Sequence, residues 1–322
     1  MTDQVDGLAP FPVVALGGGH GLHASLSALR RVVGDLTAVV TVADNGGSSG
    51  RLRDQFAVLP PGDLRMALAA LCGDDDWGRT WARLVQHRFA GSGEMNGHVV
   101  GNLLIVGLWE LLGSPVEALD WVGRLLGAHG RVLPMALTPM DITAQVAGLD
   151  PERPDQVTQV RGQTEVAGTT GDLLGIELEP ADPLACPEAV EAVHRAAWVV
   201  LGPGSWYTSV IPHLMVPDLR AALTGTSARV IVVLNLEGQP GETHGFEPED
   251  HLAALLDHAP DLLVHTVLAD TSRVQDPDRL ARAVRMAGGE LVLADIAADD
   301  RTPRHDPVKL AAAYSRIMVP GD

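Results

Sequence analysis

A glycine-rich stretch near the start of the chain has the residue types of a phosphate-binding loop. Its candidate residues are Gly17, Gly18, Gly19, His20 and Gly21. It follows the apolar run 13–16 and precedes leucines at helical spacing, so we expect it to join a buried strand to a helix. Glycines let the backbone approach a phosphate, and the N–H groups at a helix N-terminus can point at it. On its own the motif is weak, and a tight turn formed for packing alone is the alternative.

A second polar loop combines groups that bind phosphate, ribose hydroxyls and metal ions. It follows an apolar run at 38–43, and its candidates are Asp44, Asn45, Gly46, Gly47, Ser48, Ser49 and Arg51. Asp44 is suited to ribose hydroxyls or Mg²⁺, and the serines and Arg51 are suited to phosphate oxygens. A solvated turn would account for the glycines and serines, but it would not require their place at the end of a strand.

Further candidates stand beside glycine or proline in later segments. Asp63 and Arg65 follow Pro61 and Gly62, where Asp63 is equally well placed to cap a helix. The later candidates are His98, Asn102, Gly202, Pro203, Gly204, Ser205, Thr208, Asn235 and Arg304. His98 could instead satisfy a buried backbone group. The loop at residues 202–209 repeats the strand-to-glycine-loop design, so we expect the two loops to converge on one crevice.

These loops need strands and helices that bring them to one place. Apolar, β-branched runs expected to form strands lie at 13–16, 38–43, 131–137, 198–201, 230–234, 262–268 and 290–293, and helical patterns separate most of them. Between residues 138 and 181 the pattern changes to short β-like pieces divided by Gly, Pro and Asp, which indicates an inserted antiparallel β segment. We therefore predict an α/β fold with a Rossmann-like, doubly wound and mostly parallel sheet, in a single domain over 11–319 with a β-rich insertion at 138–181.

Composition and charge narrow the class of protein. The chain has 322 residues and a net charge of −18, which argues against nucleic acid because a phosphate backbone would be repelled. Cys72 and Cys186 lack metal-ligand spacing and indicate a reducing compartment. Residues 1–10 do not resemble a signal peptide, and no apolar run reaches the roughly 18 residues of a membrane span. We expect a cytoplasmic protein that binds neither nucleic acid nor membrane.

Taken together, the polar segments resemble the YvcK/CofD-like family. The matching stretches are ALGGGHGL at 15–22, TVADNGGSSGRL at 41–52, PPGDLR at 60–65, GHVVGN at 97–102, LGPGS at 201–205 and RHDP at 304–307. They occur in order over nearly the whole chain, which makes the match far more specific than one glycine loop. The resemblance implies a Rossmann-like (CofD-like) core that binds a diphosphate-containing ligand.

The resemblance leads to two functional hypotheses. One branch consists of gluconeogenesis factors, cytoplasmic bacterial proteins of carbon metabolism and cell shape that bind UDP-sugars such as UDP-N-acetylglucosamine, with no established reaction. The other consists of magnesium-dependent 2-phospho-L-lactate transferases of deazaflavin coenzyme biosynthesis. We favour a UDP-sugar-binding regulatory protein and keep the transferase as the alternative. A nicotinamide-dependent oxidoreductase is a weaker third hypothesis, which rests on Gly19, Gly21, Ala24 and Asp44.

Three positions depart from the family pattern. Asn45 stands where a second aspartate is usual, which leaves Asp44 as the one carboxylate of its loop and the candidate ligand for Mg²⁺. His20 replaces a usual threonine, and Phe246 replaces a frequent tyrosine. No catalytic pair can be singled out, so these departures favour binding over catalysis. Packing in such sheets often supports dimers, which makes a homodimer a further expectation.

Overall fold

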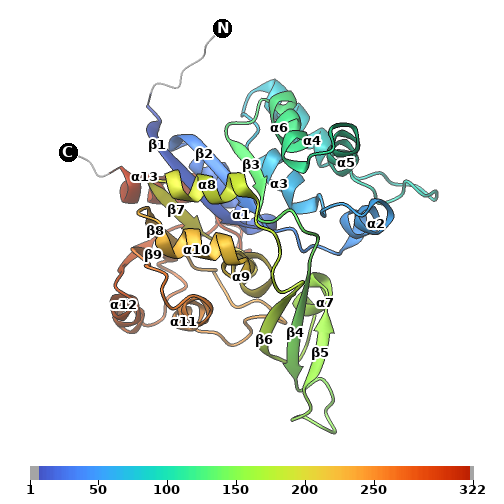
Figure 1. Ribbon diagram of the computed structural model, residues 1–322. Helices are drawn as coiled ribbons and strands as arrows, with labels where there is room; N and C mark the ends of the chain where they lie inside the picture. Colours follow the sequence, from blue (N-terminus) through green and yellow to red (C-terminus); the bar gives the residue numbers. More distant parts are fainter. Residues whose placement is uncertain (1–6, 320–322) are drawn as a thin grey trace.

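Seven parallel strands form the centre of the protein (Figure 1). The computed structural model describes residues 7–319, so the first six residues of the acidic leader lie outside it. The strands run in the order β10-β9-β8-β7-β1-β2-β3. Their bounds are β1 (Ala9–Gly17), β2 (Val33–Val40), β3 (Arg131–Pro134), β7 (Trp198–Leu201), β8 (Arg229–Val233), β9 (Thr266–Asp270) and β10 (Glu290–Ala294).

The strand order reverses between β1 and β7. β1 pairs in parallel with β2 on one side and with β7 on the other, and later strands extend the sheet outward from both. Leu16 stands opposite Val39 of β2 and Leu201 of β7, so the three strands end at the same edge. Ligands of such sheets bind outside the carboxyl ends of the strands at this switch point. The predicted doubly wound sheet is confirmed.

Helices cover the sheet and connect its strands. Their bounds are α1 (Gly19–Leu29), α2 (Gly47–Phe56), α3 (Gly62–Ala70), α4 (Asp76–Val85), α5 (Val100–Leu112), α6 (Pro115–Leu126), α8 (Pro187–Arg195), a π-helical turn (Trp206–Val210), α9 (Pro212–Met215), α10 (Pro217–Gly225), α11 (Pro248–His258), α12 (Pro277–Met286) and α13 (Pro307–Met318). Many of these helices begin with proline. Proline has no backbone N–H, but the N–H groups of the first turn have no acceptor within the helix, so no hydrogen bond is lost. Asp306 caps α13 by accepting from the N–H groups of Val308 and Lys309.

The inserted β segment forms a second sheet. β4 (Asp141–Ala147) pairs antiparallel with β5 (Thr158–Arg161) and β6 (Asp172–Glu179), and the short α7 (Gln163–Ala167) lies between β5 and β6 in the chain. Figure 1 shows this sheet projecting from the lower side of the parallel sheet. The predicted antiparallel insertion is confirmed as part of the fold, while the boundaries 138–181 and 11–319 stay predictions.

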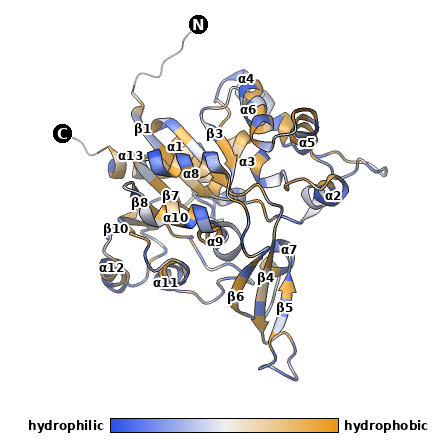
Figure 2. Cartoon of the chain, in the orientation of Figure 1, coloured by the Kyte–Doolittle hydropathy of each residue, from blue (hydrophilic) through white to orange (hydrophobic). Residues whose placement is uncertain are grey.

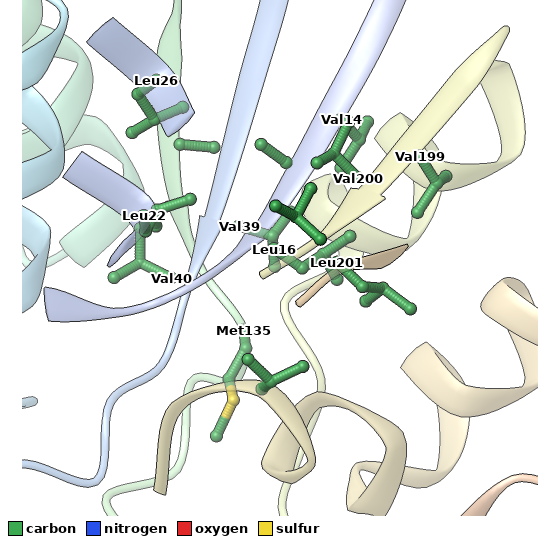
Figure 3. Close-up of a cluster of buried hydrophobic side chains, with 14 of the residues drawn as sticks. Val14, Leu16, Leu22, Leu26, Val39, Val40, Met135, Val199, Val200 and Leu201 are labelled. Atoms are coloured by element: carbon green, nitrogen blue, oxygen red, sulfur yellow. The ribbon is translucent and has the colours of Figure 1, made fainter. Parts of the chain in front are cut away.

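Apolar side chains fill the space between the sheet and its helices. Figure 3 shows Leu16 of β1 among Val39 and Leu201 of the neighbouring strands, with Leu22 of α1 beside them, and all are buried. Burial of each such side chain stabilises the fold by roughly 1.5–3 kcal/mol. The hydropathy colours of Figure 2 show the same division, with apolar residues on the strands and polar residues on outer helix surfaces.

Several predicted strands differ from the observed ones in their bounds; the run 131–137 was expected to be a strand, for example, but β3 ends at Pro134. Two others are shifted at both ends by two residues or more. The run 38–43 was expected to be one strand, but β2 begins at Val33 and ends at Val40. The run 262–268 was also expected to be a strand, but β9 begins at Thr266, and Leu262 and Val264 are buried in the connection before it. Both differences have the same cause. Buried positions require apolar residues whether or not their backbone pairs with a neighbouring strand, so an apolar run can extend beyond the strand. Within residues 7–319, no helix has the length and apolar character to cross a bilayer.

The fit of α1 against the loop after β7 gives a first prediction. A Cβ on Gly21 would lie 2.5 Å from the Cα of Gly204 and closer still to the Pro203 carbonyl. We expect Gly21→Ala to lower the free energy of unfolding by about 1–3 kcal/mol in urea titrations. The added methyl group would collide with backbone atoms of Pro203 and Gly204, which cannot move aside easily. The control is Gly107→Ala on α5, where a Cβ meets nothing within 4 Å. That variant gains helix propensity and should stabilise by about 0.5–1 kcal/mol. Equal effects of the two substitutions would contradict this packing.

Candidate functional site

A pocket of about 430 Å³ opens at the switch point between β1 and β7. We call it the switch-point pocket. Its wall includes His20, Gly21, His23, Pro203, Gly204, Asn235, Glu237, Gln239, Arg304 and His305. These residues come from the first turns of α1, from the loops after β7 and β8 and from the segment before α13. The expected convergence of the glycine loops from the two halves of the chain is therefore observed.

Asn235 fixes the shape of the loop that follows β7. Its Oδ1 accepts from the N–H of Gly204 at 3.0 Å, and its Nδ2 donates to the carbonyl of the same residue at 2.7 Å. Gly204 has φ of +146° and Gly202 has φ of +75°, which favour glycine at both positions. Of the predicted site residues in this loop, Pro203 and Gly204 line the pocket and Gly202 does not, and Asn235, in the loop after β8, holds Gly204 in place.

A buried carboxylate organises the predicted residues Ser205 and Thr208. Glu242 accepts hydrogen bonds from the Thr208 hydroxyl at 2.8 Å and the Tyr207 N–H at 2.9 Å, and also from the Ser205 hydroxyl. Neither hydroxyl belongs to a residue that lines the switch-point pocket. Sequence reasoning did not select Glu242. Its one signal was an acidic residue in a glycine- and proline-rich loop after a buried strand.

Asp44 and Asp63 lie together beside the first glycine loop. A Cβ on Gly18 would come within 2.6 Å of Asp63 Oδ2, and a Cβ on Gly62 within 2.8 Å of Asp44 Oδ2. Asp63 accepts from the N–H of Gly19, while its Oδ2 is buried without a hydrogen-bond partner among the described residues. Burial, and next the charge of Asp44, raise the pKa of Asp63 to about 7.

The capping role proposed for Asp63 is wrong. α3 begins at Gly62 and its N-cap position is Pro61, so Asp63 lies inside the first turn. Its side chain points instead toward the glycine loop, where it contacts the N–H of Gly19. The other expectation, that Asp63 belongs to a ligand-binding site, stays a prediction.

Four other predicted residues form a buried hydrogen-bond chain behind the loops. Arg65 donates to Asn102 Oδ1 at 3.3 Å, and Asn102 donates to the Ser48 hydroxyl at 3.2 Å. Ser48 also accepts from the N–H of Val99 and contacts His98 Nδ1. These contacts tie α2, α3 and α5 together. His98 therefore pairs with a hydroxyl, and not with the backbone group that the alternative interpretation expected.

Asn45 and Arg51 contact segments outside the switch-point pocket. The Asn45 amide donates to Glu165 at 2.7 Å and accepts from the Thr164 N–H at 3.0 Å, so it attaches the β-rich insertion to the Asp44 loop. Arg51 donates to the carbonyls of Glu94 and Asn96. Gly46, Gly47 and Ser49 belong to the same loop and the start of α2. That these groups bind phosphate stays a prediction.

His20 and Arg304 also belong to the wall of the switch-point pocket. His20 stands at the start of α1, near His23, whose pKa is lowered by burial and next by the charges of His20 and Arg30. The guanidinium of Arg304 pairs with Asp300 at 2.7 Å, so it already has an acidic partner.

The residues present fit a divalent cation shared with a ligand. Asp44 was the predicted magnesium ligand, and Asp63 adds a second carboxylate with an unpartnered buried oxygen beside it. Magnesium binds through one or two carboxylates and takes its other ligands from water and phosphate. No cluster of three or more His, Cys, Asp or Glu exists among residues 7–319, so the protein does not supply a full ligand set there.

Comparison with known proteins agrees with the architecture. A family model described as 2-phospho-L-lactate transferase CofD matches residues 13–309. A Mycobacterium tuberculosis protein (strain H37Rv) named "Putative gluconeogenesis factor" is 54% identical over 310 residues, which cover 95% of this chain and 90% of that protein. The "Gluconeogenesis factor" of Listeria innocua is 34% identical over 317 residues, which cover 95% of each. A crystal structure of a Bacillus halodurans protein has a TM-score of 0.84 at 31% identity and covers 95% of this chain and 99% of that chain.

The fold and the pocket define a Rossmann-like α/β protein whose candidate site lies at the switch point of a doubly wound sheet. The chain belongs to the CofD family. The family predicted from the glycine-rich segments is thus confirmed.

The raised pKa of Asp63 predicts how stability depends on pH. The folded state holds the proton up to about pH 7, whereas the unfolded chain releases it near pH 3.8. Between these values the unfolded state binds fewer protons at Asp63, so the contribution of Asp63 to the free energy of unfolding should fall as pH rises from about 4 to 7, by on the order of 4 kcal/mol. It is measured as the pH-dependent difference between the wild type and Asp63→Asn, because buried histidines such as His213 contribute the opposite slope. Asp63→Asn should remove this slope in urea titrations without divalent cations. Asp54→Asn, at an exposed position on α2, is the matched control and should keep it. An unchanged slope in Asp63→Asn would show that Asp63 does not hold the proton.

Proposed function

We propose that this protein is a gluconeogenesis factor, a regulator of carbon metabolism and cell shape that binds a UDP-sugar of the UDP-N-acetylglucosamine type in the switch-point pocket. The observation that carries the proposal is the meeting of two glycine loops from opposite halves of the chain at this pocket. Relatives that match almost their full length carry the gluconeogenesis factor name, which supports the same function.

The start of α1 supports a site for the diphosphate. The first N–H groups of a helix have no acceptor within the helix, and the helix dipole adds partial positive charge there. α1 begins at Gly19, whose N–H donates to Asp63. The N-cap residue Gly18 supplies no capping side chain and the first turn holds no acid, so the N–H groups of His20 and Gly21 are suited to phosphate oxygens. The absence of a side chain at Gly21 brings this end of α1 against Gly204.

Asp44 and Asp63 are suited to hold Mg²⁺ beside the diphosphate. The cation would neutralise charge shared between the phosphates and the carboxylates. Asp63 without a cation keeps a proton up to about pH 7, because its pKa is raised by burial and by Asp44. The cation would replace that proton, which makes both carboxylates ionic in the complex.

The transferase alternative is not favoured. The acidic pair is compatible with magnesium-dependent transfer of a phospholactyl group, but the curated relatives with high coverage are named for gluconeogenesis. A homodimer that acts in the cytoplasm and binds neither nucleic acid nor membrane is part of the proposal. The net charge of −18 supports the exclusion of nucleic acid.

Isothermal titration calorimetry tests this function directly. We expect saturable binding of UDP-N-acetylglucosamine with Mg²⁺, and weaker binding of GDP and NAD. Asp44→Asn combined with Asp63→Asn should abolish the Mg²⁺ enhancement, whereas Asp54→Asn should keep it. Absence of binding heat at millimolar UDP-sugar would contradict the proposal. Product formation from a nucleotide donor and a deazaflavin precursor, followed by mass spectrometry, would support the transferase instead.

A further inference from the structure

A second pocket of about 430 Å³ opens between β6 of the inserted sheet and α11 (Figure 1). We call it the aromatic pocket. Its lining comes from β6, from Tyr207 and Phe246, and from one face of α11. It shares no lining residue with the switch-point pocket, so the function proposed for that pocket does not account for it.

The face of α11 at this pocket combines acidic and small residues at helical spacing. Asp250, Ala253, Ala254 and Asp257 line the pocket at positions i, i+3, i+4 and i+7. Residues at this spacing share one face of a helix, so the two alanines leave room between carboxylates that stand about 10 Å apart along the axis. Glu249 on the same helix pairs with an arginine, but neither pocket carboxylate has a basic partner within residues 7–319.

The position of Asp257 is unfavourable for the helix itself. It lies in the last turn of α11, where the negative end of the helix dipole repels a carboxylate. Asp250 stands in the first turn, where its Oδ2 accepts from the N–H of Glu247 at 2.9 Å as part of a capping box. The cap accounts for Asp250, whereas no contact in the described part of the chain accounts for Asp257. A cation in the pocket would compensate its charge.

Tyr207 brings an unpaired hydroxyl to the same pocket. Its ring packs edge-on against Phe246 and His258, with centroids 6.4 and 6.2 Å away, and its backbone N–H donates to Glu242. Tyr207 is only 8% exposed, yet its hydroxyl has no hydrogen-bond partner among residues 7–319 and is not closed off from solvent. The hydroxyl therefore reaches solvent through the pocket that Tyr207 lines.

These groups together suit an organic cation. Burial, and next the charges of Asp257 and Glu242, raise the pKa of Tyr207, which places the Asp257 carboxylate near this ring. Carboxylates and aromatic rings both attract an ammonium or guanidinium group, and the exposed Leu174 suits the apolar stem that carries it. No lysine or arginine of the described chain lines the pocket, and His258 is its one basic side chain. The pocket thus disfavours anions.

We propose that the aromatic pocket binds an organic cation, namely a guanidinium or ammonium group carried on an apolar stem. Asp257 pairs with the charged group, whose N–H groups also donate to the Tyr207 hydroxyl, and Phe246 contacts the stem. A free amine or guanidine and a basic side chain of another protein share this chemistry. The net charge of −18 attracts such a ligand at long range. Binding at this pocket needs no nucleotide.

Fluorine NMR of the protein labelled with 3-fluorotyrosine tests this inference. The chain has two tyrosines, and the other one, Tyr314, is fully buried with its hydroxyl 2.7 Å from Ser25, so its signal serves as an internal reference. Tyr207→Phe assigns the two signals. Millimolar butylguanidine should shift the Tyr207 signal saturably and leave that of Tyr314 unchanged. Butylurea, a neutral molecule of the same shape, should shift neither signal.

Two variants separate charge from shape. Asp257→Asn should weaken the binding of butylguanidine about tenfold, because it removes the ion pair. Its thermal stability should equal or exceed that of the wild type, since the carboxylate is unfavourable at the end of a helix. Ala253→Leu should fill the hollow between the carboxylates and block binding with no change of charge. Asp261→Asn, at an exposed acid that does not line the pocket, is the matched control and should bind like the wild type.

A short neutral peptide that contains one arginine, with both ends blocked, identifies the source of the cation. A saturable Tyr207 shift with this peptide, lost in Asp257→Asn, supports a basic side chain of another protein. A shift with butylguanidine alone supports a free small molecule. Equal shifts by butylguanidine and butylurea, an unchanged affinity in Asp257→Asn, or no Tyr207 shift with butylguanidine or the peptide overturns the inference. None of these results bears on the function proposed for the switch-point pocket.

Discussion

The pairing of β1 with both β2 and β7 is the constraint on which the candidate site depends. Because all three strands run in parallel and end together, the loops that follow them leave the sheet at one edge. The loop after β1 then packs against the loop after β7 so closely that Gly21 has no room for a side chain beside Gly204. Neither loop forms the pocket alone. A change that shifts one loop must therefore change the pocket wall that the other supplies.

Local electrostatics at this edge differ from the charge of the whole chain. A net charge of −18 repels anions at long range, but the start of α1 places backbone N–H groups and the positive end of a helix dipole at the pocket. Asp44 and Asp63 oppose it, since two carboxylates held together cannot both ionise without compensation. A proton or a cation bound at these carboxylates removes the repulsion between them. We therefore expect an anionic ligand and a cation to bind at this site better together than either alone.

Sequence reasoning recovered features that depend on neighbouring residues and missed those that depend on distant ones. The strand, glycine loop and helix at residues 13–29 follow from local periodicity, and the rules for doubly wound sheets placed the loops at one edge. The role of Asp63 required the exact start of α3, which propensity does not define. The contact of Asn45 with Glu165 spans 120 residues, and the unpaired state of Asp63 Oδ2 depends on every element packed around it. Such pairings follow from tertiary packing, which a single sequence pattern does not encode.

A crystal structure grown with UDP-N-acetylglucosamine and Mn²⁺, a magnesium substitute with a strong anomalous signal, tests the central claim most directly. The account predicts diphosphate oxygens within hydrogen-bond distance of the N–H groups of His20 and Gly21, and an anomalous peak between Asp44 and Asp63. Diphosphate density at another surface, with the switch-point pocket empty, would contradict it.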